Sequence, residues 1–371
     1  MNLPPTEALG PARVDYTPDQ PWWLAAPELK NAIEQQPPFP RNSAYYQFGD
    51  AVLHIASDTK RLLDMFEQLY GDCAVPPPVP PERPRVRCLA RRGGHPPLLL
   101  LTFLEGAPHD PASAFLPMRA TRVWDSPLPG WRLAFGAAAP ILAACGAHVL
   151  INQQAWDHLP VEYLVNATLT AQPELVAVHA ASLRMNNAGL LLSGPSQSGK
   201  TTTSLHLAAR GLTLLGDEVA LIRLATNEIV PFRRTANLRP GPRARELSAA
   251  VERLAGGHEP PVDDEGVAAL RIGDLFPGAP ARPVSLSAAF FLAGFADHPS
   301  IAPFRPTLQD LDAYSVLAGN EIATLWGLPL ERRALRLMAL RHLLDRLPCW
   351  LLTVGAPGET AELIERTMED L

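Results

Sequence analysis

The residues of this chain that could carry out chemistry are concentrated in one segment, 188–222. Within it, Gly194, Gly199, Lys200 and Thr201 fit the pattern G-x-x-x-x-G-K-[ST], which is typical of a phosphate-binding loop. In such a loop the backbone N–H groups surround the phosphates, the Lys reaches the β- and γ-phosphates, and the Thr hydroxyl binds Mg²⁺. The pattern predicts a nucleotide-phosphate site. The competing interpretation is a Gly-rich turn with an incidental Lys.

The elements around the loop agree with this prediction. An apolar run at 190–192 predicts a strand that enters the loop, and 201–210 predicts a helix that ends at Gly211. The N-terminus of that helix would direct its positive charge at the phosphates. We expect the nucleotide to contact the whole loop and the residue after it: Gly194, Pro195, Ser196, Gln197, Ser198, Gly199, Lys200, Thr201 and Thr202.

An acidic pair follows the next predicted strand, 212–215. Asp217 and Glu218 come at its carboxyl end, and the carboxyl ends of the strands in an α/β sheet gather at the edge where ligands bind. One carboxylate could hold Mg²⁺ and another could accept the proton of an attacking hydroxyl. The alternative is a solvated acidic turn.

A histidine upstream has a predicted place beside the loop. Residues 175–185 and 190–193 read as two strands joined by a turn at 186–189. If the strands pair as an antiparallel hairpin, the paired residue numbers sum to roughly 374, which sets His179 opposite Pro195. His179 is either part of the site or an ordinary structural histidine, and both interpretations stay open here.

Three arginines follow the predicted hairpin of strands 219–224 and 228–232. Arg233, Arg234 and Arg239 could clamp a transferring phosphate or could be plain surface charge. Both interpretations remain open.

Length and composition bound the fold and the partners. A chain of 371 residues with 47% hydrophobic and 19% charged residues predicts two domains, 1–155 and 156–371. A net charge of -6 argues against a nucleic-acid partner, since no basic stripe is available to neutralise phosphates. The four cysteines, Cys73, Cys88, Cys145 and Cys349, lack metal-site spacing and suit reduced thiols in the cytoplasm.

Neither a signal peptide nor a membrane span is expected. The N-terminus has no basic region followed by an apolar core. The most apolar stretch, 133–151, contains Pro140 and His148 and reads as buried elements.

The remaining pattern predicts a smaller N-terminal α/β domain and a larger α/β domain that carries the loop. In the first we expect a hairpin at 44–55, a helix after Asp58, an extended polyproline connection at 74–84 and strands at 85–91 and 97–103. The second adds the following expectations: a helix at 161–171, an irregular region at 241–278, a strand at 284–292, helices at 308–328 and 330–347, a strand at 349–354 and a helix at 359–371.

The order of these motifs resembles the HPr kinase/phosphorylase family. The matching residues are V-H-A-A-S-L at 178–183, the loop at 194–201, Arg210–Gly211, and G-D-E at 216–218. The resemblance covers about 50 residues. It implies a P-loop catalytic domain of the HPr kinase and phosphoenolpyruvate carboxykinase type, and ATP- and Mg²⁺-dependent phosphorylation of a Ser hydroxyl on a small protein or a precursor peptide.

The resemblance also implies roles for single residues. Lys200 would bind the β- and γ-phosphates, and Thr201 would ligate Mg²⁺. Asp217 would be the catalytic base, with Glu218 beside the metal and His179 orienting or assisting Asp217. Two other functions stay open: a kinase of a small metabolite such as free serine, and a non-catalytic, nucleotide-gated binding module. A homo-oligomer is likewise left open.

Overall fold

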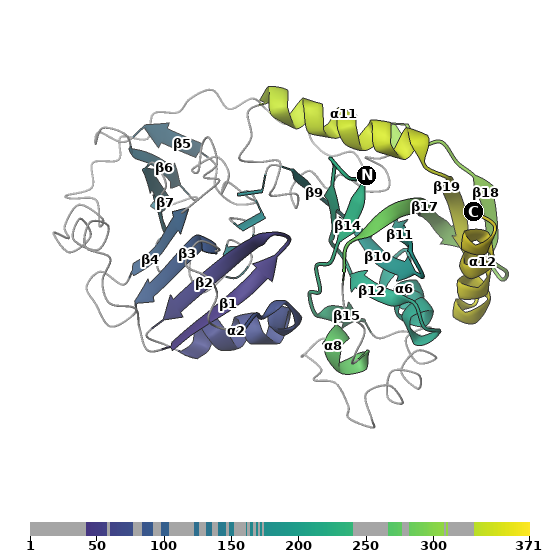
Figure 1. Cartoon of the computed structure of the whole chain (residues 1–371), viewed down its shortest axis with the longest axis horizontal. Helices are drawn as coiled ribbons and strands as arrows, with labels where there is room; N and C mark the ends of the chain where they lie inside the picture. The colour runs from purple at the N-terminus through teal and green to yellow at the C-terminus, as the bar shows by residue number, and fades with distance from the viewer. Residues whose placement is uncertain are drawn as a thin grey trace.

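The computed structural model describes most of the chain from residue 42 onward. The described residues are 42–57, 60–76, 84–91, 98–103, 122–125, 131–135, 140–145, 148–151, 161, 164–165, 168–169, 171–172, 174–239, 266–276, 282–307, 309–310 and 330–371. They form a mixed α/β architecture in which two large sheets lie towards opposite ends of the long axis (Figure 1).

The first sheet has eight strands in the order β1-β2-β3-β4-β8-β7-β6-β5, and a helix, α2 (Lys60–Tyr70), follows its first hairpin. A short 3₁₀ turn, η1 (Gly71–Cys73), continues from that helix. The strands are β1 (Asn42–Phe48), β2 (Ala51–Ser57), β3 (Pro84–Arg91), β4 (Leu98–Phe103), β5 (Arg122–Asp125), β6 (Trp131–Phe135), β7 (Pro140–Cys145) and β8 (His148–Ile151).

The second sheet has nine strands, seven of them in the order β12-β10-β11-β17-β14-β13-β9, with β19 beside β17 and β18 beside β19. These strands are β9 (Leu175–Val178), β10 (Ala180–Met185), β11 (Ala188–Ser193), β12 (Thr213–Gly216), β13 (Ala220–Arg223), β14 (Glu228–Val230), β17 (Val284–Phe295), β18 (Ser300–Pro303) and β19 (Cys349–Val354). A separate small ribbon pairs β15 (Ala236–Leu238) with β16 (Ala268–Leu270).

Strands β11, β12, β17 and β19 of the second sheet run in the same direction. Strand β10 is antiparallel to both β11 and β12, so those two strands run parallel to each other. Strand β17 is parallel to β11, and β19 is parallel to β17. The carboxyl ends of β11, β12, β17 and β19 therefore meet at one edge of the sheet, which is where α/β sheets bind ligands.

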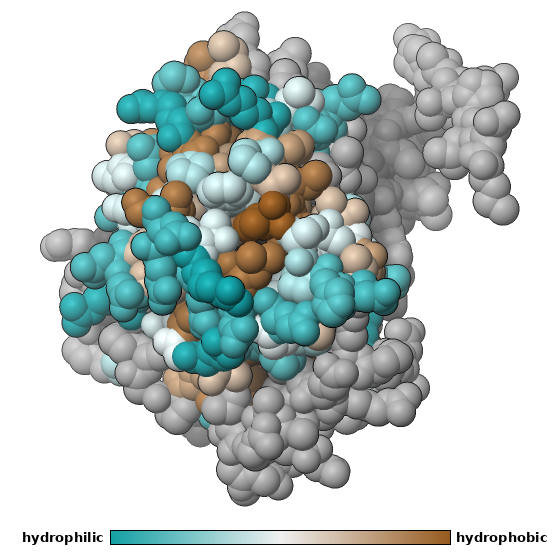
Figure 2. Space-filling model, turned by 90° about the vertical axis from the view of Figure 1, so that its right-hand side faces the viewer, coloured by the Kyte–Doolittle hydropathy of each residue, from teal (hydrophilic) through white to brown (hydrophobic). Residues whose placement is uncertain are grey.

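Both faces of this sheet are covered, because its central strands are apolar at nearly every position. In β11, Leu191 and Leu192 point to opposite faces. Leu192 packs in a core with Leu205 of α6 (Lys200–Ala209) and Ile364 of α12 (Pro357–Glu369). Leu191 packs in a core with Leu340 of α11 (Leu330–Arg346). Figure 2 shows the face formed by β18, β19 and α12, where apolar residues lie between hydrophilic ones.

A third core joins the first hairpin and α2 to the second sheet. Phe48, Phe66 and Tyr70 are fully or nearly fully buried, and they pack with Leu221 of β13 and with Phe232. The rings of Phe48 and Tyr70 each lie within 6 Å of the ring of Phe232. Residues on both sides of position 155 thus share one hydrophobic core, and a domain boundary at that position stays a prediction.

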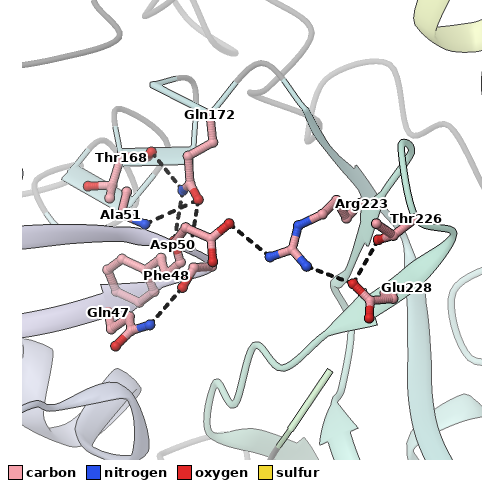
Figure 3. Close-up of polar contacts among 10 residues, drawn as sticks. Gln47, Phe48, Asp50, Ala51, Thr168, Gln172, Arg223, Thr226 and Glu228 are labelled. Atoms are coloured by element: carbon pink, nitrogen blue, oxygen red, sulfur yellow. Dashed lines mark hydrogen bonds and ion pairs between the residues drawn. The ribbon is translucent and has the colours of Figure 1, made fainter. Parts of the chain in front are cut away.

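A buried glutamine fixes this junction (Figure 3). The Gln172 side-chain oxygen accepts hydrogen bonds from the backbone N–H groups of Asp50 and Ala51, at 2.8 and 3.2 Å. Its amide nitrogen donates to the carbonyls of Phe48 and Thr168, at 2.7 and 3.1 Å. One side chain therefore satisfies four backbone groups of a turn and a helix that are far apart in sequence.

Replacing Gln172 with Ala is expected to lower the free energy of unfolding by about 2–4 kcal/mol, since buried backbone groups would lose their partners. Urea unfolding measures this loss. Gln47 is the matched control, because it is exposed and makes a hydrogen bond to Gly49. The same replacement there should cost no more than about 0.5 kcal/mol, and equal losses at both positions would contradict the prediction.

An ion-pair network extends the junction (Figure 3). The Arg223 guanidinium lies 2.8 Å from the carboxylate of Asp50 and 2.8 Å from that of Glu228, which also accepts a hydrogen bond from the Thr226 hydroxyl. Hydrogen bonding to Thr226 and Arg223 lowers the pKa of Glu228 below its usual range. The first hairpin is thus tied to the β13–β14 hairpin by charge as well as by packing.

Near the loop, the structure confirms the expected strands at 190–192 and 212–215 and the helix at 201–210, within a few residues. It corrects two other expectations. The predicted strand 175–185 is interrupted at His179, because β9 pairs with β13 whereas β10 pairs with β11 and β12. The observed hairpin pairs Met185 with Ala188 and Ala180 with Ser193. The turn is therefore the two residues 186 and 187 and is not centred on Asn187, so the predicted register with His179 opposite Pro195 is wrong by one residue.

The expectation of an irregular region at 241–278 is wrong in part. Its described residues include β16 and a short helix, α8 (Ile272–Leu275), which is held by a hydrogen bond of 2.6 Å from the Gly273 N–H to the Asp72 carboxylate of η1. Such short elements depend on a distant partner and leave no local pattern in the sequence. Strands β15 and β18 were not expected either.

Other expectations are confirmed within a few residues. These are the first hairpin, the strands at 85–91 and 97–103, the helices at 330–347 and 359–371, and the strand at 349–354. The expectations for residues 1–41, 58, 77–83, 240–265 and 311–328 concern parts of the chain outside the described residues. Among the described helices, none is long and apolar enough to cross a membrane.

Candidate functional site

The predicted phosphate loop follows β11 directly and leads into α6. Two residues of the loop have positive φ angles, 65° at Gln197 and 95° at Gly199, and the second angle favours glycine. Gly194 has no room for a side chain, since a Cβ there would lie 2.6 Å from the Ser198 hydroxyl oxygen and 3.2 Å from the carbonyl oxygen of Leu292. The two glycines of the motif are therefore required by the shape of the loop.

Lys200 is turned inward over this loop. Its ammonium donates hydrogen bonds to the carbonyls of Gly194 and Pro195, at 2.7 and 3.0 Å. The residue is only 7% exposed although it carries a charge. A lysine buried in this way is satisfied by the carbonyls of the loop, and phosphate oxygens could replace those carbonyls as acceptors.

Asp217 joins the end of β12 to the first turn of α6. Its Oδ2 accepts a hydrogen bond of 2.8 Å from the Thr201 hydroxyl, and its Oδ1 accepts one of 3.4 Å from the Ser204 hydroxyl. The aspartate is 2% exposed. The structure thus brings together three residues that the sequence predicts as site residues: Lys200, Thr201 and Asp217.

Burial perturbs the protonation of this carboxylate. Desolvation raises the pKa of Asp217 from the ordinary value of 3.8 to about 6, and the negative charge of Glu218 acts in the same direction. Hydrogen bonds from Thr201 and Ser204 and the charge of Lys200 oppose the rise. A buried carboxylate with a pKa near the working pH is suited to general-base chemistry.

The turn that carries the acidic pair has an unusual backbone. The Val219 N–H donates to the carbonyl of Asp217 at 2.8 Å, and Glu218 between them has a φ of 65°. This is a three-residue γ-turn, a rare and strained conformation of the kind that clusters at functional sites. The Glu218 carboxylate lies 3.3 Å from the Arg234 guanidinium, which compensates its charge.

The first hairpin and its helix hold the segment that carries Arg234. The Thr235 hydroxyl donates to the carbonyl of Gln68 at 2.6 Å, and the Thr235 N–H donates to that of Leu69 at 2.9 Å. The thiol of Cys73 lies 3.6 Å from the carbonyl oxygen of Arg233. The C-terminal end of α2 and the turn η1 therefore support the arginine that pairs with Glu218.

The three arginines have different surroundings. Arg234 faces Glu218, as described above. The Arg233 Nε donates to the carbonyl of Leu214 at 3.1 Å, and desolvation lowers the pKa of its guanidinium. Arg239 is exposed. Which of them contacts a phosphate stays a prediction.

His179 lies at the same edge of the sheet as the loop. It occupies the break between β9 and β10, and its carbonyl accepts a hydrogen bond of 3.4 Å from the hydroxyl of Ser193, the last residue before the loop. Since β10 also pairs with β12, this break lies towards the end of β12 that carries Asp217. A role of His179 in orienting Asp217 stays a prediction.

Ser204 is a site residue that the sequence reasoning missed. It lies three residues after Thr201, on the same face of α6, so helical spacing alone could have pointed to it. In the part of the chain that the structure describes, no three His, Cys, Asp or Glu side chains gather as a ready metal site.

Asp217 is expected to make stability depend on pH. Because the pKa of Asp217 is higher in the folded state than in the unfolded state, folding is accompanied by uptake of a proton between about pH 4 and 6. The free energy of unfolding therefore falls as pH rises through that window. Asp217→Asn removes the effect. In urea unfolding, the free energy of unfolding of the variant minus that of wild type should increase by up to about 3 kcal/mol between pH 4 and pH 7.

The control for this measurement is Asp64→Asn, since Asp64 is an exposed residue of α2 that pairs with Lys60. The raised pKa would be contradicted if the difference in free energy of unfolding between Asp217→Asn and wild type did not change with pH. It would also be contradicted if that difference changed with pH in the same way as the one for Asp64→Asn.

Comparisons with known proteins give little further support. No protein-family model matches the chain, and no curated protein sequence matches it. Among solved structures, an HPr(Ser) kinase/phosphatase from Coxiella burnetii is similar, with a TM-score of 0.27 and 15% sequence identity over 52% of this chain and 88% of that chain. A TM-score this low establishes neither a family nor an activity for this chain.

Proposed function

We propose that this chain is a kinase that uses ATP and Mg²⁺ to phosphorylate a Ser hydroxyl of a small protein or precursor peptide. The observation that carries the proposal is the hydrogen bond between Thr201 and Asp217. It connects the phosphate loop to a buried carboxylate whose pKa is about 6. A loop suited to phosphate and a carboxylate suited to general-base chemistry are thus adjacent.

The loop has the features that a nucleotide triphosphate needs. It precedes the N-terminus of α6, where backbone N–H groups and the helix dipole favour an anion. Gly194 leaves no room for a side chain, and the buried Ser198 hydroxyl has no hydrogen-bond acceptor or donor among the described residues. Lys200 would exchange the carbonyls of Gly194 and Pro195 for the β- and γ-phosphates.

The side chains at the site also suit Mg²⁺. Mg²⁺ prefers oxygen ligands and is usually held by one or two carboxylates together with phosphates and water. Thr201 and Asp217 supply such oxygens, and Glu218 lies next in the chain. The ion would neutralise charge on the transferring phosphate.

The transfer itself needs little covalent help from the enzyme. The acceptor's hydroxyl oxygen forms a bond to the γ-phosphorus, the bond from that phosphorus to the β–γ bridging oxygen breaks, and ADP leaves. Asp217 accepts the hydroxyl proton. With a pKa of about 6 the carboxylate is ionised at neutral pH and remains basic enough to take that proton.

The choice of a serine on a protein or peptide is supported by the resemblance of residues 178–218 to the HPr kinase/phosphorylase motifs. We also propose the cytoplasm as the compartment, since ATP is abundant there and the described cysteines Cys73, Cys88 and Cys349 carry free thiols.

The proposal is tested by incubating the protein with Mg²⁺, ATP labelled at the γ-phosphate and a cell extract. Label on a protein or peptide band, lost with EDTA, supports it. Label only on a small metabolite would favour a metabolite kinase. ATP binding without any transfer would contradict catalysis and favour a nucleotide-gated binding module.

A further inference from the structure

Strand β17 contains an irregularity directly before its last residue. Its pairing with β19 matches Leu292 with Leu352 and then Gly294 with Thr353, so one extra residue, Ala293, is inserted. Gly294 has a φ of 137°, which only glycine adopts readily. This is a β-bulge, a feature that commonly redirects a side chain next to a functional site.

The bulge changes the face on which Phe295 lies. Along the regular part of β17, Phe290 and Leu292 face α6, and Phe291 faces α11. If the side chains alternated strictly between the two faces up to the end of β17, Phe295 would lie on the same face as Phe291. Instead it pairs with Val354, which belongs to the core on the α6 side. The bulge therefore places Phe295 on the face that carries the phosphate loop.

Phe295 contacts the loop and is half exposed. A Cβ on Gly199 would lie 3.3 Å from its ring, which places the ring against the residue before Lys200. The residue is 51% exposed. One exposed aromatic residue needs no explanation by itself. An exposed aromatic that a bulge directs onto a phosphate loop indicates a surface that a ligand covers.

The order of the strands indicates which part of a ligand this is. The sheet runs β12-β10-β11-β17, and the loop follows β11. Asp217 follows β12 and Phe295 ends β17, so the two residues flank the loop from opposite sides. The acceptor hydroxyl must approach Asp217. The base is at the opposite end of the nucleotide from the transferred phosphate, so it would lie on the side of Phe295.

We propose that Phe295 is the platform on which the base of the bound nucleotide stacks. This inference rests on the proposed function and adds the position of the base and the residue that recognises it. The ring lies against the loop at Gly199 and half of the residue is exposed, so a planar base could stack on its exposed face. Purines stack well on such rings, and their polar edges remain hydrated.

The test compares ATP with inorganic tripolyphosphate, which has the same phosphates but no base, by calorimetric titration with Mg²⁺. Phe295→Ala is expected to weaken ATP binding about tenfold, the usual loss for one base–aromatic contact, and to leave tripolyphosphate binding unchanged. Phe295→Trp should retain ATP affinity. Met338→Ala removes an exposed apolar side chain of α11 and serves as the matched control, without effect on either ligand.

Three results would overturn the inference. Equal weakening of ATP and tripolyphosphate by Phe295→Ala would mean that the ring supports the loop. Unchanged ATP binding in that variant would mean that the base lies elsewhere, although the proposed kinase would stand. Failure of the wild-type protein to bind either ligand would contradict the nucleotide site itself, and this inference with it.

Discussion

Replacing Lys200 with Met is expected to lower phosphate transfer by at least about a hundredfold, because the β- and γ-phosphates would lose the charge that compensates them. Met keeps much of the length and volume of the buried stem, so the loop should remain folded. A radiolabel-transfer assay measures the effect, and titration with ATP should show weaker binding in parallel.

The control is Lys60→Met. The chain has only three lysines, Lys30, Lys60 and Lys200, and Lys60 is exposed at the start of α2, where it pairs with Asp64. Transfer by this variant should equal that of wild type. Undiminished transfer by Lys200→Met would show that the loop does not hold the phosphates that react.

Replacing Asp217 with Asn is expected to abolish turnover and to preserve ATP binding. Asn keeps the shape of the side chain but cannot accept the proton of the hydroxyl, and a positioned general base contributes about 10²–10⁴-fold to rate. Single-turnover transfer and ATP titration separate the two effects. In the wild type, the rate at saturating substrate should rise with pH through about 6 as the carboxylate ionises.

Asp64→Asn again provides the control, with unchanged rate and unchanged pH profile expected. Full activity of Asp217→Asn would mean that the base is another group. Loss of ATP binding in this variant would mean that the lost activity reflects loss of the bound nucleotide and its metal, and not loss of a proton acceptor.

The sequence predicted which residues around the loop lie together, because the signals there are local. The spacing of Gly194, Gly199, Lys200 and Thr201 sets the loop, and the strand and helix around it have clear apolar patterns. The placement of Asp217 next to Thr201 follows from the general rule that the carboxyl ends of parallel strands meet. That rule needs only the order of the elements.

The supporting parts could not be predicted in the same way. The hydrogen bonds of Thr235 to Gln68 and Leu69 join residues far apart in the chain. The hydrogen bonds between Gln172 and the turn of the first hairpin likewise join residues far apart in the chain. Neither contact leaves a periodic pattern. The break at His179 exchanges one strand partner for another, and hydrophobicity alone does not report such an exchange.

Phe295 shows a further limit of sequence reasoning. The run 284–292 predicted a strand, and strict alternation would have placed Phe295 on the α11 face. A single inserted residue before Gly294 reverses that assignment. A glycine near the end of an apolar strand was the available signal, and it did not show which residue would be redirected.

The most direct test of the account is the identification of the phosphorylated atom. The protein is incubated with Mg²⁺, ATP and acceptor candidates from a cell extract, and phosphorylated products are mapped by mass spectrometry. The account predicts phosphoserine on a small protein or peptide with wild-type protein, and none with Asp217→Asn or without Mg²⁺. Bound ATP with no phosphorylated product, together with identical behaviour of Asp217→Asn, would contradict it.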